Sequence, residues 1–165
     1  MISIDEIYKI IENEEIIYEE TDLKNMHSKG IYFKVDEMAP IIAIDSSIVK
    51  HNKVYISILS EELGHHFTTQ GNLLKLSNSY SEKILRDKYE VTAKKWAANL
   101  LINDYDFVQA LLTCISNKYD MCEHFNITYE LLEKKINSIV CDELLYMKIK
   151  ELFQLYEVQY NSCNI

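Results

Sequence analysis

Three residues near the middle of the chain, Glu61, Glu62 and His65, have the types and spacing needed for hydrolytic chemistry. They lie in residues 56–69, which we predict to be a helix and refer to below as the motif helix. Residues four apart share a helix face, so Glu61 and His65 would point the same way, with Glu62 about 100° round. The arrangement matches an H-E-x-x-H helix, in which two histidines bind a metal ion and the glutamate is the general base. Here the first histidine is replaced by Glu61.

A second predicted helix, residues 83–102, carries the carboxylate of Glu90 on a face otherwise formed by small and aliphatic residues. Ala93 and Ala97 on this face would let two helices approach closely. If the face meets the motif helix, Glu90 can supply a third metal ligand from a neighbouring backbone. The alternative is an ordinary surface ion pair between Glu90 and Lys94, four residues further on.

Two stretches carry a family resemblance: Glu61-Glu62-Leu63-Gly64-His65-His66-Phe67, and Glu90-x-x-Ala93-x-x-Trp96-Ala97-x-x-Leu100-Leu101. In order and spacing they resemble the ImmA/IrrE family of metallopeptidases, in the branch found on prophages and other mobile elements. The resemblance covers about residues 30–101. It implies a gluzincin-like domain with a small sheet packed on the motif helix. It also implies Glu61, His65 and Glu90 as metal ligands and Glu62 as the catalytic general base.

The same resemblance implies an intracellular metal-dependent endopeptidase that cleaves a partner regulatory protein, a helix-turn-helix repressor. Zinc is the expected cofactor. Because Glu61 replaces an imidazole, the Glu, His, Glu set is harder and more negative than His, His, Glu, and its preference for zinc should be weaker. Mn2+, Fe2+ and an empty site therefore remain alternatives. The second function class is a non-catalytic anti-repressor that binds the same kind of partner with a degenerate metal site.

The other four histidines of the chain differ in how well they could serve as metal ligands. His66 falls on the packed side of the motif helix, which favours a hydrogen-bonded core residue or a support for the ligands. His51 precedes the helix and is an alternative to Glu61 as a ligand. His27 and His124 lie in polar surroundings and are predicted to be surface residues.

The elements that must hold these residues are expected to form a mainly helical α+β fold. Three glycines, one proline and a hydrophobic content of 48% indicate a chain with one core and few long linkers. Two β-branched and aromatic runs, residues 30–35 and 40–45, predict strands of a small sheet. This sheet either covers the core, as most strands do, or has an exposed edge that could pair with an extended peptide. The predicted helices are 4–13, capped by Ser3, then 56–69, 83–102, 107–115, 119–124, 128–139 and 141–160, and the predicted strands are 30–35 and 40–45.

This pattern divides the chain into a metallopeptidase-like domain, residues 1–103, and a helical C-terminal subdomain, residues 104–165. Within the second part, residues 118–136 have the proportions of a helix-turn-helix. The final helix has an apolar stripe that we expect to pack back onto the domain. Its members are Leu144, Leu145, Ile149, Leu152, Phe153, Tyr156 and Tyr160.

Charge and composition limit the partners. A net charge of −9 argues against direct nucleic-acid binding, which needs clustered Lys and Arg, and favours a protein partner. No apolar run approaches the roughly 20 residues needed to cross a membrane. We therefore expect a cytoplasmic protein whose four cysteines, Cys114, Cys122, Cys141 and Cys163, are reduced and packed as small apolar side chains. The sequence does not indicate an oligomeric state.

Overall fold

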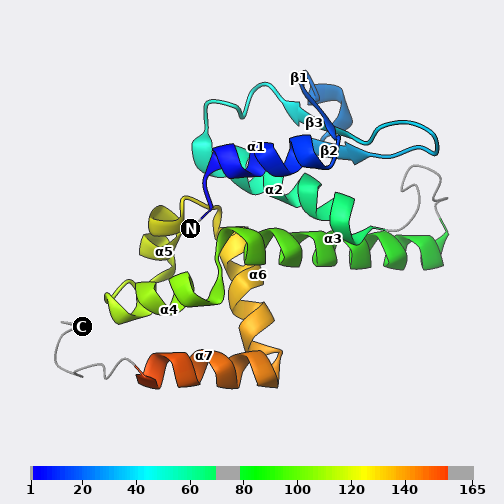
Figure 1. The fold of residues 1–165 in the computed structure, drawn as a ribbon. Helices are drawn as coiled ribbons and strands as arrows, with labels where there is room; N and C mark the ends of the chain where they lie inside the picture. The colour runs from blue at the N-terminus through cyan, green and yellow to red at the C-terminus, as the bar shows by residue number, and fades with distance from the viewer. Residues whose placement is uncertain (1, 70–78, 156–165) are drawn as a thin grey trace.

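A computed structural model describes residues 2–69 and 79–155 of the chain. These residues form seven α-helices, one 3-10 helix and a three-stranded sheet, which confirms the mainly helical α+β class (Figure 1). In chain order the elements are α1 (Ile4–Asn13), β1 (Ile17–Thr21), η1 (Lys24–Met26), β2 (Gly30–Phe33), β3 (Ile41–Asp45), α2 (Asn52–Thr68), α3 (Tyr80–Leu101), α4 (Asp104–Leu112), α5 (Lys118–Phe125), α6 (Tyr129–Val140) and α7 (Glu143–Leu155).

Helix α1 begins where its cap predicts. The Ser3 hydroxyl accepts a hydrogen bond from the Glu6 backbone N–H, and the Glu6 carboxylate accepts one from the Ser3 N–H at 2.8 Å. This reciprocal capping box satisfies two of the unpaired N–H groups at a helix start. Ile7 and Ile11 are buried one turn apart, so a single apolar face fixes α1 to the core.

The sheet contains three strands, in the order β1-β3-β2, where the sequence predicted two. The central strand β3 pairs with β1 in parallel and with β2 in antiparallel fashion. Ile42 and Ile44 are fully buried and place the sheet against the rest of the core. Strand β1 was missed because almost all of its residues are exposed, so the apolar alternation typical of a half-buried strand is lacking.

Helix α2 lies between the sheet and the long helix α3 (Figure 1). Leu59 and Leu63 are fully buried along it, as the predicted apolar face requires. Gly64 permits the close approach to α3, because a Cβ atom built there would lie 2.5 Å from the Ala93 backbone oxygen. Small residues therefore set the separation between these two helices, as the sequence predicted for the Ala93 face.

Helices α4, α6 and α7 lie on the opposite side of α3 from the sheet, with α6 packed directly against α3, and α5 lies beside the C-terminal end of α3 (Figure 1). The hydrophobic core is continuous from Ile7 to Ile149. The division of the chain at residue 103 stays a prediction. Helices α5 and α6 are joined by a short turn in which Asn126 is left-handed, with a φ of 53°.

The apolar stripe predicted for the last helix is only partly buried. Ile149 is buried, and Leu145, Leu152 and Phe153 pack against the core. Leu144 is 84% exposed, so its place in the stripe was wrong. The reason is helical spacing, because Leu144 lies about 100° round the helix from Leu145 and still further from Ile149, away from the buried face. Tyr156 and Tyr160 lie outside the described residues.

The thiol prediction holds for part of the chain. Cys122 is free and buried, whereas Cys141 is free but exposed, so the packing prediction is wrong for Cys141. Cys114 is disulfide-bonded, so the expectation of a reduced thiol is wrong there. Cys163 lies outside the described residues. None of the helices within residues 2–69 and 79–155 has the length and apolar character needed to cross a bilayer.

Candidate metal centre

A cleft of about 490 Å3 opens between strand β2 and the helices α2 and α3. Strand β2 lines one wall with Gly30, Ile31 and Tyr32. The helices contribute the charged side chains of the other wall, which are Glu61, Glu62, His65, Arg86 and Glu90. The motif residues thus face a single cavity that solvent and ligands can enter.

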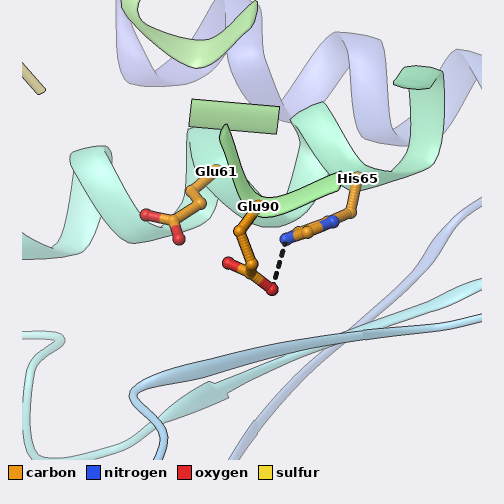
Figure 2. A group of neighbouring side chains, drawn as sticks. All are labelled: Glu61, His65 and Glu90. Atoms are coloured by element: carbon orange, nitrogen blue, oxygen red, sulfur yellow. Dashed lines mark ion pairs between the residues drawn. The ribbon is translucent and has the colours of Figure 1, made fainter. Parts of the chain in front are cut away.

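Glu61, His65 and Glu90 converge at this cleft from two helices (Figure 2). One ligand atom from each residue lies within 4.8 Å of the other two. The His65 Nε2 atom is 3.5 Å from Glu90 Oε1. Metal bonds of about 2 Å hold tetrahedral ligand atoms roughly 3.4 Å apart, so the group needs about an ångström of closure to surround one cation.

The ring of His65 is held in a defined orientation. The imidazole is 5% exposed, and its Nδ1 atom lies 3.2 Å from the Thr69 hydroxyl oxygen, one helical turn on. This leaves Nε2 facing Glu90 and the cleft. Metal-binding histidines commonly use their second ring nitrogen for such a hydrogen bond, which fixes the ring.

The charges of the three residues are strongly coupled. Burial raises the pKa of Glu61 above its ordinary value, although the nearby Lys94 ammonium offsets part of this rise. The hydrogen bond with His65 lowers the pKa of Glu90 despite partial burial. Burial opposes protonation of His65, but Glu90 and Glu62 raise its pKa overall. Proton and cation thus compete for His65, because a metal ligand must have an unprotonated ring nitrogen.

Glu62 is only 7% exposed and lies against the sheet rather than among the three converging side chains. Burial raises the pKa of its carboxyl to about 8, with a hydrogen bond from the Tyr32 backbone acting in the opposite sense. The room for this side chain comes from Gly30, where a Cβ atom would lie 2.6 Å from Glu62 Oε1. A buried carboxyl with a raised pKa beside a cleft is typical of a proton-transferring residue.

His66 points away from the converging side chains. Its Nδ1 atom lies 3.2 Å from the Tyr32 hydroxyl, and its Nε2 atom lies 3.3 Å from a Glu14 carboxylate oxygen. It is a hydrogen-bonded, largely buried residue that ties α2 to β2 and to the end of α1. Its supporting role for the ligands stays a prediction.

His51 does not reach the cleft, because it caps the start of α2 and lies ten residues, or about 15 Å, along the helix from Glu61. The structure therefore does not support it as a replacement for Glu61. His27 and His124 are exposed, as predicted.

Several residues around the cleft had no clear signal in the sequence. Lys94, considered only as a partner of Glu90, lies 3.5 Å from Glu61 Oε1 and 2.6 Å from Glu130 Oε1. Arg86 lies one turn before Glu90 on the same helix and lines the cleft. Only the i,i+4 spacing of Arg86 and Glu90 could have suggested a place beside the site.

Comparison with known proteins supports the same region of the chain. No solved structure gives a significant match. The family model of the IrrE N-terminal-like domain, which defines the M78 peptidases, matches residues 13–137, a span that includes the sheet, the cleft and helices α2 to α5. A match over most of the chain confirms the predicted family. The chain belongs to the IrrE N-terminal-like family of M78 peptidases.

Proposed function

We propose that the protein is a metal-dependent endopeptidase that cleaves a partner regulatory protein, a helix-turn-helix repressor. Membership of a peptidase family implies a protein substrate. The observation that carries the proposal is the convergence of Glu61, His65 and Glu90 next to the buried carboxyl of Glu62. The ionised carboxylates of Glu61, Glu62 and Glu90 would repel one another at one cleft without a cation. Packing alone therefore does not account for their convergence.

The three converging residues fit a divalent cation. Two carboxylates and one imidazole form a set of hard and borderline donors that suits Zn2+, Mn2+ or Fe2+, with Zn2+ as the expected ion. A cation held there would polarise a peptide carbonyl and make a nearby water more acidic. The remaining chemistry falls to the side chains of the protein.

Glu62 would accept a proton from the attacking water and deliver it to the leaving amine nitrogen. Burial raises the pKa of its carboxyl to about 8 without a cation, which makes it a stronger base than an exposed glutamate. The peptide nitrogen that receives the proton then departs as a neutral amine. Glu62 is only 7% exposed, which limits the water that can reach its carboxyl.

Strand β2 provides a surface along which a substrate could extend. Among the described residues β2 pairs with β3 on one side, and its residues Gly30, Ile31 and Tyr32 line the cleft on the other. An extended peptide that adds to a strand edge gains backbone hydrogen bonds independent of its sequence. A peptide bound in this way would cross the cleft beside Glu62 and His65.

The acidic character of the chain supports a basic partner. A net charge of −9 complements the positive surface by which a repressor binds DNA, and such complementarity accelerates association and orients the partner. The alternative function is a non-catalytic anti-repressor. It is favoured by one observation: Glu61 stands where the usual first histidine would be, and a carboxylate there weakens the preference of the site for zinc.

The test is a Glu62→Gln variant incubated with the helix-turn-helix repressor encoded nearest to the gene, with added Zn2+. We expect loss of cleavage by a factor of about 10² to 10⁴, the usual contribution of a general base, with Zn2+ affinity retained. Cleavage products are identified by mass spectrometry, and metal affinity is measured by calorimetry. Glu12→Gln, on the exposed face of α1, is the matched control and should cleave normally.

Unchanged cleavage by Glu62→Gln would remove Glu62 as the general base. If the unmodified protein binds the repressor without cutting it, the anti-repressor alternative replaces the peptidase.

A further inference from the structure

Lys94 lies beside the one residue that distinguishes this centre from an H-E-x-x-H site. Its Nζ atom is 3.5 Å from Oε1 of Glu61 and 2.6 Å from Oε1 of Glu130 on helix α6. The Lys94 side chain is 22% exposed and that of Glu61 is 15% exposed, so water screens this pair only weakly. Glu130 is 63% exposed and anchors the ammonium from the solvent side.

The contact between Lys94 and Glu61 also affects the charge balance around a bound cation. In a His, His, Glu site with a glutamate base, two carboxylates balance the two positive charges of the cation. Here Glu61 adds a third carboxylate to Glu62 and Glu90. The ammonium of Lys94 brings one positive charge to Glu61, while its other partner, Glu130, is 63% exposed and more strongly screened by water.

The geometry also leaves Glu61 able to bind a cation. A carboxylate has two oxygens, and an ammonium contact to one of them leaves the other available. Carboxylates that bind metals are commonly held by a hydrogen-bonding partner of this kind, which fixes their orientation. Lys94 is fixed in turn by its contact with Glu130, so the orientation of Glu61 depends on the packing of α6 against α3.

We propose that Lys94 is a positioning residue. By contacting Glu61, it allows this carboxylate to replace the missing first histidine as a metal ligand. The pair presents a metal-binding oxygen with no net charge, as a neutral imidazole presents a nitrogen. This inference rests on the proposed metal centre. It does not depend on catalysis by Glu62.

The test is a double-mutant cycle read by zinc calorimetry on the full chain. The four proteins are the natural chain, Lys94→Gln, Glu61→His, and the combination of both changes. With Glu61 present, Lys94→Gln removes the contact that orients its carboxylate, and we expect Zn2+ affinity to fall at least tenfold. In the Glu61→His background, Lys94 is a cation close to the metal whose remaining partner is the exposed Glu130, so the same change should raise Zn2+ affinity.

Two further variants control this reading. Lys95→Gln, an exposed neighbour on α3, makes the same charge change away from the cleft and should leave Zn2+ affinity unchanged in both backgrounds. Lys94→Arg keeps the positive charge and should retain most of the natural affinity. Circular dichroism of every variant separates loss of metal binding from loss of the fold.

The outcomes distinguish this inference from the proposed function. If Lys94→Gln changes Zn2+ affinity by the same factor in both backgrounds, or if none of the four proteins binds Zn2+, the inference is wrong. If the sign of the effect reverses but the natural protein cleaves no repressor, Lys94 retains its assigned role and the peptidase proposal fails.

Discussion

At the scale of single residues, the candidate centre depends on side chains that hold its ligands. His65 can present Nε2 to the cleft because its Nδ1 atom contacts the Thr69 hydroxyl. The next threonine back, Thr68, has its hydroxyl engaged differently, as it donates to the Gly64 carbonyl oxygen at 2.8 Å. Two adjacent threonines at one helix end therefore have separate roles, one toward the site and one within the backbone.

This difference gives a prediction for Thr69→Val. The change keeps the shape of the side chain and removes the oxygen that orients His65, so Zn2+ affinity should fall about tenfold, the lower end of the range for such supporting contacts. Thr68→Val is the matched control and should bind Zn2+ as the natural protein does. Calorimetric titration of both variants checks the prediction, and equal affinities would remove Thr69 as a support of the ring.

The sequence predicted the residues that belong to one helix better than those that depend on two. Helical spacing alone placed Glu61 and His65 together on α2. Helical i,i+4 spacing offered Lys94 only as an alternative partner for Glu90, yet it contacts Glu61 across the helix interface. Such a contact depends on how α2 and α3 are aligned, which the spacing within either helix does not determine.

At the scale of elements, the centre depends on the interface between α2 and α3. Glu90 reaches His65 because Gly64 and Ala93 bring the two backbones close together. A Cβ atom at position 64 would collide with the backbone oxygen of Ala93, so no side-chain rotation could make room for a larger residue there. The separation of the helices and the geometry of the ligands are therefore coupled.

Gly64→Ala should weaken both the fold and the centre. An alanine gains about 1 kcal/mol of helix propensity, but overpacking a closed interface costs about 1 to 3 kcal/mol. We expect a net fall of about 1 kcal/mol in the free energy of unfolding in urea, together with weaker Zn2+ binding as Glu90 moves away. The exposed Lys95→Ala variant on α3 should show neither effect. Unchanged zinc affinity in a destabilised Gly64→Ala protein would show that the ligands tolerate a wider separation.

Most elements could be predicted from the sequence, since their caps and apolar periodicity are strong. The predicted helix over residues 4–13 matches α1, and the long predicted helix became α3 with small shifts at its ends. Strand β1 was missed because its place is set by pairing with β3, a distant contact, rather than by its own side chains.

At the scale of the whole molecule, one buried cation joins the site-bearing helices to the C-terminal helices. Lys135 on α6 is 1% exposed and donates hydrogen bonds to Asn99 at 2.9 Å and to Asp104 at 2.8 Å. Asp104 also accepts a hydrogen bond from Lys148 on α7 at 3.0 Å. Asp104 therefore connects α4, α6 and α7 through paired charges.

Asp104→Asn should destabilise the whole fold. It removes the charge that compensates Lys135, and an uncompensated buried charge costs about 3 to 5 kcal/mol. We expect the free energy of unfolding in urea at pH 7 to fall by about 3 kcal/mol, the lower end of this range, because Asp104 itself is partly exposed. Asp87→Asn, an exposed change of the same type on α3, should cost little.

The pH dependence of this loss has a definite sign. Burial alone would raise the pKa of Asp104, but hydrogen bonds from Lys135 and Lys148 hold it below its ordinary value of 3.8. The ionised form is therefore favoured in the folded state, and its contribution is complete above the ordinary pKa and lost as pH falls through the folded value. The difference between the natural protein and Asp104→Asn should shrink below about pH 4. A constant difference down to pH 3 would contradict the assignment.

Because the three converging side chains come from two separate helices, an ion bound among them would act as a removable cross-link between distant parts of the chain. Ligands that bind only the native state stabilise it by mass action, by about 2.7 kcal/mol at a hundred times the dissociation constant. Thermal melting with and without a chelator would therefore report occupancy directly. The choice among Zn2+, Mn2+ and Fe2+ can be made in this way before any substrate is known.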